Sequence, residues 1–167
     1  MFGLSKDRLT NKQIEQLAEF FAMSILDSTN EFTTGFEEKF DYDITDKETF
    51  ALSALIYHSW LFTAAMGVLE LPDWKKVTDQ VHSRIAEITS ISDFALLVKE
   101  KYPQYYLVYK NPSIGGRDFG FGKFLAEQFF KERNIAIDVL YYLDKITNVY
   151  IQTRQDLIRG VYDAIKK

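Results

Sequence analysis

Residues 50–69 read FALSALIYHSWLFTAAMGVL, a run of 20 residues that contains no Asp, Glu, Lys or Arg. A surface helix of this length would carry charges on its outer face, so the run predicts a helix that is buried on all sides. Twenty helical residues also span about 30 Å, the thickness of a bilayer core. Polar side chains such as Ser53, His58 and Thr63 interrupt the run, however. We therefore predict a central core helix over about Lys47–Leu71 and expect no membrane association.

The rest of the chain is dominated by apolar residues at helical spacing. Ile14, Leu17, Phe21 and Ile25 form one apolar stripe, which predicts a helix from Thr10 or Asn11 to Asp27. Phenylalanines spaced four apart favour a short second helix around Glu31–Phe40. In chain order, further helices are predicted over Asp73–Thr89, Asp93–Tyr102, Gly120–Arg133 and Ile135–Ile165. Pro103 should stop the helix that ends at Tyr102. The prediction is a single all-α domain over residues 1–167: a compact bundle of six to seven helices around the central one, with a long C-terminal helix.

The composition is that of a globular protein, with 47% hydrophobic and 26% charged residues. The chain has no cysteine, which excludes disulfides and thiolate metal sites and fits a reducing compartment. Its first residues, Met1 to Arg8, lack a basic segment followed by an apolar core. We therefore expect no secretory signal and a cytoplasmic location.

Charge is distributed unevenly along the chain. Residues 1–50 carry 5 Lys/Arg against 11 Asp/Glu, a net charge of −6, whereas residues 101–167 carry 11 against 7, a net charge of +4. These two parts can attract each other within one fold or between two copies, or they can face different partners. Ordinary solvated helix faces explain the same numbers without any partner.

The glycine-rich segment from Gly115 to Phe124 does not match a phosphate-binding motif. Arg117 stands where a phosphate loop needs its first glycine, and Phe124 replaces the hydroxyl residue that would bind magnesium. Leu125 stands where the dinucleotide-binding fingerprint needs its third glycine. We predict neither site.

Metal-binding and catalytic motifs are also missing from the sequence. The chain has two histidines, His58 and His82, and neither belongs to a zinc-protease or di-iron motif. Asp41 and Asp43 resemble the start of a calcium loop, but Leu52 stands where the bidentate glutamate is required. We expect no cofactor and no metal; the sequence does not decide whether the protein is an enzyme, although it favours a non-enzymatic role.

Tyrosines, lysines and glycines concentrate between Tyr102 and Lys123. Tyrosine and arginine are typical of binding hot spots because they combine a large contact area with polar ends. The sequence does not decide whether Tyr105–Tyr109 is a short strand or another helical turn. The same aromatics can instead plug one end of the bundle. The predicted partner- or ligand-binding residues are Tyr105, Tyr106, Tyr109, Lys110, Arg117, Asp118 and Phe119.

The leading hypothesis is a non-enzymatic protein-interaction module of regulatory, adaptor or toxin-neutralising type. It would bind another protein, or a second copy of itself as a homodimer, through this aromatic and glycine-rich loop and an acidic N-terminal face. The alternative is a helical small-molecule-binding protein or enzyme, with an inter-helix cavity for a small apolar ligand whose polar groups are Tyr57 and His58. With 14 Phe and 10 Tyr, the chain is suited to such a cavity, to an exposed aromatic patch or to a sealed aromatic core. Nucleic acid binding is not expected, because the calculated pI is about 5.2.

Overall fold

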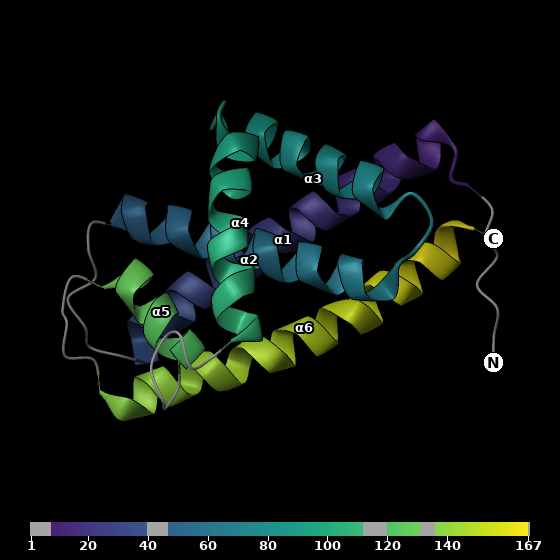
Figure 1. Cartoon of the computed structure of the whole chain (residues 1–167). Coiled ribbons are helices and arrows are strands. Elements are labelled where there is room, and N and C mark those ends of the chain that lie inside the picture. Colours follow the sequence, from purple (N-terminus) through teal and green to yellow (C-terminus); the bar gives the residue numbers. More distant parts are fainter. Residues whose placement is uncertain (1–7, 40–46, 112–119, 131–135, 167) are drawn as a thin grey trace.

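The computed structural model describes residues 8–39, 47–111, 120–130 and 136–166, which form six helices (Figure 1). In chain order these are α1 (Asn11–Lys39), α2 (Lys47–Leu69), α3 (Trp74–Thr89), α4 (Phe94–Lys110), α5 (Gly120–Phe129) and α6 (Ile137–Ile165). The predicted all-α bundle with a long C-terminal helix is therefore confirmed.

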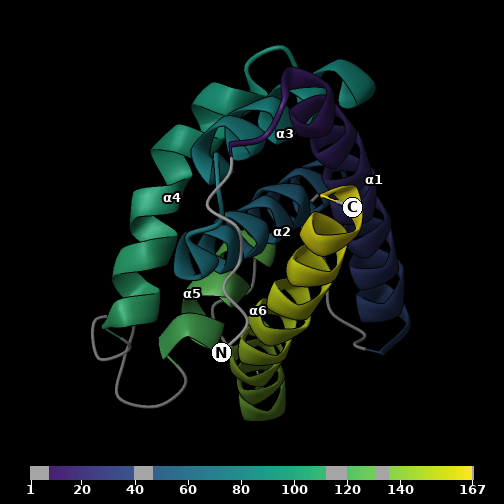
Figure 2. The same ribbon diagram turned by 90° about the vertical axis from the view of Figure 1, so that its right-hand side faces the viewer.

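Helix α2 is the central helix of the bundle. It contacts each of the other five helices, and Figure 2 shows it between α4 on one side and α1 on the other. Every residue from Ala54 to Phe62 is buried, so the helix has no solvent-facing side over more than two turns. Among the described helices it alone is long and apolar enough to cross a membrane, but 61% of its most apolar stretch is buried inside the fold. Burial on all sides accounts for the absence of charged residues from Ala54 to Phe62.

Helix α1 is one continuous helix of 29 residues, and the predicted break after Asp27 was wrong. The hydroxyls of Ser28 and Thr29 donate hydrogen bonds to the carbonyl oxygens of Ser24 and Ile25, each at 2.8 Å. These polar side chains therefore bond back along the same helix and do not cap a new one. The buried stripe also continues without a break through Phe32 and Phe36.

Helix α4 continues through Pro103 to Lys110, so the predicted stop at Tyr102 was also wrong. Pro103 lacks the N–H that would bond to the carbonyl of Lys99, a loss that costs about 3 kcal/mol in a helix interior. Both residues are exposed, so that carbonyl lies on the solvent side. Beyond the proline, Tyr105 and Val108 are buried on the face that already buries Phe94. Their burial keeps the chain helical, and Tyr105–Tyr109 is not a strand.

Helices α5 and α6 approach each other closely at Gly122. A Cβ atom added there would lie 2.0 Å from the carbonyl oxygen of Leu140, so only glycine fits. The helix predicted over Gly120–Arg133 is observed as far as Phe129, and residues 131–135 lie outside the described part of the chain.

Many of the aromatic rings form a sealed core. Phe32 is a shared neighbour: its ring centroid lies 6.3 Å from that of Phe50 and 5.7 Å from that of Phe129. Near the other face of α2, the ring of Trp60 packs against those of Tyr105 and Phe121 at 5.5 and 5.3 Å. These distances are typical of aromatic contacts in protein interiors. For these residues the abundance of Phe and Tyr is explained by packing.

Candidate functional site

The tyrosines predicted to bind a partner are separated by the helical conformation of α4. Tyr105 is buried against α2, whereas Tyr106 is 55% exposed and Lys110 lies over its ring, with the ammonium 5.6 Å from the centroid. The hydroxyl of Tyr109 donates a hydrogen bond to Oδ1 of Asn148 on α6 at 3.1 Å. Of this group, Tyr106 and Lys110 therefore face the solvent. The predicted site residues Arg117, Asp118 and Phe119 lie outside the described residues.

Tyr57, proposed as a polar group of a cavity, bonds across the interface between α2 and α6. The Tyr57 hydroxyl lies 2.7 Å from Oγ1 of Thr147. The Thr147 hydroxyl in turn donates a hydrogen bond to the carbonyl oxygen of Leu143 at 2.8 Å. Because the single proton of Thr147 is used in the second bond, Tyr57 donates in the first. Burial raises the pKa of Tyr57 above its usual value, so it stays protonated as this bond requires.

His58 faces a buried arginine on α6. Nη2 of Arg154 lies 2.9 Å from Nδ1 of His58, and only 6% of Arg154 is exposed. A guanidinium can only donate, so Nδ1 accepts and the imidazole proton lies on Nε2. Burial, followed by the charge of Arg154, lowers the pKa of His58 well below its usual value. The pair is thus a neutral histidine that accepts from a cation.

This pair leaves two buried donors unmet. Nε2 of His58 and Nε of Arg154 have no hydrogen-bond partner within the part of the chain that the structure describes. The rings of Phe32, Tyr57 and Tyr150 surround the imidazole, with centroids 5.2–5.3 Å from its own. His58 is therefore enclosed by aromatic side chains, and Arg154 links α6 to the centre of the fold.

The second histidine is also buried and neutral. Nε2 of His82 on α3 lies 3.0 Å from the hydroxyl of Tyr102 on α4. Burial lowers the pKa of His82 to about 4. The contact joins α3 to α4, and both histidines thus lie at interfaces between helices.

The exposed face of α1 carries a row of acidic residues. Glu15, Glu19, Met23, Asp27 and Glu31 follow one another at a spacing of four, and all five are exposed. Residues four apart in a helix form a ridge that is inclined to the helix axis by about 26°. The row therefore crosses the face of α1 diagonally, and we call these five residues the acidic ridge.

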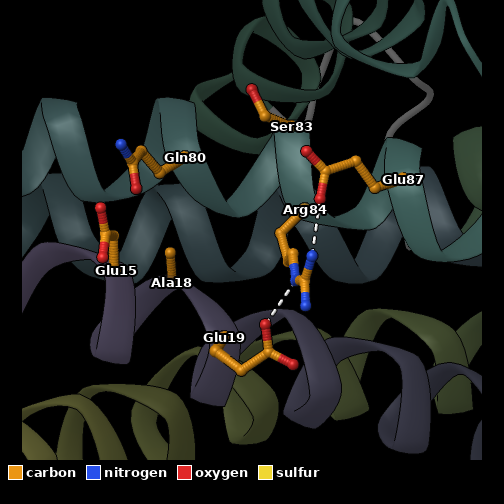
Figure 3. Close-up of a pocket in the computed structure, with 7 residues that line it drawn as sticks. All are labelled: Glu15, Ala18, Glu19, Gln80, Ser83, Arg84 and Glu87. Carbon is orange, nitrogen blue, oxygen red and sulfur yellow. Dashed lines mark hydrogen bonds and ion pairs between the residues drawn. The ribbon is translucent and has the colours of Figure 1, made fainter.

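On the α3 side, the acidic ridge borders a hollow of about 400 Å³. Figure 3 shows Glu15 and Glu19 of α1 facing Gln80 and Arg84 of α3 across this hollow, and Ser83 and Glu87 also line it. Arg84 forms ion pairs with Glu19 and, at 2.7 Å, with Glu87. One cation is thus shared by two of the three carboxylates, and the hollow has a surplus of negative charge.

On the α6 side, the ridge borders a second hollow of about 350 Å³. Its walls combine Asp27 and Glu31 with Phe20, Met23 and Leu157. Phe20 and Met23 are each 44% exposed and Leu157 is 37% exposed. Neither hollow is lined by Tyr57 or His58.

The sequence contained the signal for this surface, in the acidic surplus of residues 1–50 and in the spacing of four. The sequence predicted an acidic N-terminal face but not the row of residues that forms it, because splitting the helix after Asp27 placed Glu31 on a different helix. By contrast, no local pattern links His58 to Arg154, which lies 96 residues further along the chain.

Comparisons with protein-family models, curated proteins and solved structures give no match for this chain. Among the described residues, no group of three or more His, Asp or Glu side chains is placed to hold a metal ion. The function is therefore inferred from the chemistry of the surfaces alone.

Proposed function

We propose that the protein is a protein-interaction module that docks a positively charged partner protein on the exposed face of α1. The observation that carries this proposal is the acidic ridge, in which four carboxylates and Met23 are aligned at a spacing of four. Such an alignment presents one charged edge to a partner over several turns of helix.

The ridge has an electrostatic reason to take up cations. Glu15 and Glu19 form a like-charge pair one turn apart, as do Asp27 and Glu31. Each such pair destabilises a helix by a few tenths of a kcal/mol. Within the described residues, Glu15, Asp27 and Glu31 have no Lys or Arg at ion-pair distance. Lysines or arginines of a partner would relieve this repulsion and steer its approach.

Apolar side chains beside the ridge supply contact area that charge alone does not give. Phe20, Met23 and Leu157 are large, partly exposed and adjacent to the carboxylates. Protein interfaces combine an apolar centre with a polar rim, and aromatic residues and methionine are enriched in them. The composition of this surface supports protein docking better than binding of a free ion.

A second candidate surface is the end of α4, where Tyr106 and Leu107 are 55% and 51% exposed beside Lys110. It belongs to the segment that the sequence singled out. This surface is less acidic than the ridge and would suit a different partner. Replacing Tyr106 by alanine tests it in the same assay as the ridge.

The test is affinity capture from the source cell with two matched charge-reversal variants of the full chain. Asp27→Lys with Glu31→Lys alters the ridge, whereas Glu100→Lys with Glu127→Lys makes the same change in net charge on α4 and α5, where both residues are exposed. We expect a basic partner that is captured by the wild type and the control variant and is lost with the ridge variant. If the ridge variant still captures the partner and Tyr106→Ala does not, the docking site is at the end of α4 and not on the ridge.

A further inference from the structure

Helices α1 and α6 run antiparallel and come into contact near both of their ends. At one end Nε2 of Gln13 donates to the carbonyl of Ile165 at 3.1 Å, and at the other end the ammonium of Lys39 lies 4.1 Å from the centre of the Tyr142 ring. Figure 2 shows the start of α1 beside the end of α6. Both helices have 29 residues, so the pair is about 43 Å long.

The second hollow, lined mainly by α1 and by Leu157 of α6, lies between these two end contacts, and we call the space between the two helices here the α1–α6 groove. It lies where Ser24 of α1 comes opposite Leu157 of α6, between the contacts at the two ends. The carboxylates of Asp27 and Glu31 both belong to the α1 wall, whereas the α6 wall contributes Leu157 to the hollow. The groove is therefore apolar along its middle and acidic on one side.

A groove between two antiparallel helices has the shape that a third helix fills, because its side chains enter the spaces between neighbouring ridges. Gly160, one turn beyond Leu157 on α6, has nothing within 4 Å of the position of an added Cβ, so no side chain of the described residues occupies that space. We propose that the partner element is a basic amphipathic helix that lies lengthwise in the α1–α6 groove. This inference rests on the proposed function, since it names the form of the partner on the same ridge.

The lining residues set the pattern that such a helix must carry. Large apolar side chains at helical spacing would contact Phe20, Met23 and Leu157. Lysines or arginines four residues apart, on the flank that faces α1, would pair with Asp27 and Glu31, which are themselves one turn apart. A flexible basic segment could pair with the carboxylates, but it would not hold its apolar side chains against Phe20, Met23 and Leu157 at the same time.

Two synthetic peptides of identical composition test the inference on the full chain. Both have about 18 residues of Leu, Ala, Lys and Arg, a helix about 27 Å long. One has its leucines at helical spacing and the other has them in strict alternation, which suits a strand. We expect fluorescence anisotropy to show that the helical peptide binds at least about tenfold more tightly. We further expect Leu157→Glu, and separately Asp27→Lys with Glu31→Lys, to weaken it about tenfold or more, since tenfold is about 1.4 kcal/mol.

Matched variants guard against non-specific attraction. Val68→Glu places the same new carboxylate at an exposed apolar position on α2, and Glu100→Lys with Glu127→Lys makes the same charge reversal away from the ridge. Neither control should change the affinity for the helical peptide by more than about twofold. Equal binding of both peptides, lost only with the ridge reversal, would refute the helix while leaving the acidic docking surface intact. Binding of the helical peptide that survives both Leu157→Glu and the ridge reversal would refute the groove, as would no binding of either peptide.

Discussion

At the scale of single residues, the most consequential contact is the one between Arg154 and His58. A buried guanidinium is normally balanced by a carboxylate, because its desolvation costs several kcal/mol. Here the neighbour is a neutral imidazole, and burial also lowers the pKa of Arg154. The arrangement holds a specific tautomer of His58 and ties α6 to α2, as the hydrogen bond between Tyr57 and Thr147 also does.

Removing one member of the pair should therefore be worse than removing both. We expect His58→Leu to lower the free energy of unfolding by roughly 2–4 kcal/mol, because Arg154 stays buried without its acceptor. His58→Leu with Arg154→Met should recover at least about 1 kcal/mol of that loss. Urea unfolding of the four proteins of this double-mutant cycle gives the coupling. Additive effects would show that the contact carries no energy of its own.

Protonation of His82 should link stability to pH. Its pKa is lowered from 6.5 to about 4 in the folded protein, so the unfolded chain binds the proton first as the pH falls. The contribution of His82 to the free energy of unfolding is therefore fully present above about pH 6.5. It is lost as the pH falls toward 4, and the total loss is on the order of 3 kcal/mol.

Replacing His82 by glutamine, which does not titrate, isolates this effect. Between pH 6 and 4.5 the unfolding free energy of the variant should change less steeply with pH than that of the wild type. The difference in slope should be about 1.4 kcal/mol per pH unit, which corresponds to the uptake of about one proton on unfolding. His58, whose pKa is also lowered, continues to contribute in the same direction. An unchanged slope would mean that His82 is solvated in the folded protein.

At the scale of elements, the helices illustrate how burial overrides local signals. The charge-free run of α2 was readable because a helix buried on all sides needs no charge anywhere. The points at which α1 and α4 end could not be predicted from local sequence. In α1, serine and threonine can either cap a new helix or bond back along the same helix. Pro103 does not stop α4, since Tyr105 beyond it is buried on the same face as Phe94. The acidic ridge depended on that same continuity of α1.

Pro103 should cost stability, since it sits ten residues into a helix of 17. We expect Pro103→Ala to raise the free energy of unfolding by about 1–3 kcal/mol, because alanine restores the N–H and is the best helix former. Thermal unfolding followed by circular dichroism measures the change. A lower melting temperature for the alanine variant would argue that the helix ends at the proline.

Two helical glycines should respond in opposite ways to the same substitution. Gly122→Ala places a methyl 2.0 Å from the carbonyl oxygen of Leu140 and should lower the free energy of unfolding by at least about 1–3 kcal/mol. Gly160→Ala meets open space and should raise it by about 0.5–1 kcal/mol, the ordinary helix preference for alanine. Denaturant midpoints of the two variants provide the comparison. The same sign for both would contradict the close packing of α5 on α6.

At the scale of the whole molecule, the fold presents its charge on particular faces. The sequence showed an acidic surplus in residues 1–50, but it did not show that α1 places its carboxylates between two hollows. That arrangement depends on α3 and α6 packing on either side of α1, which no local pattern specifies. Figure 2 places α1 and α4 on opposite sides of α2, so the acidic ridge and the end of α4 can act independently.

Amide hydrogen exchange on the full chain, alone and with the partner captured in the wild-type experiment, tests the docking surface most directly. If the acidic ridge is that surface, the partner will slow exchange in α1 between Glu15 and Glu31 and in α6 around Leu157, while α4 stays unchanged. Slower exchange confined to Tyr106–Lys110 at the end of α4, with α1 unaffected, would contradict the proposal.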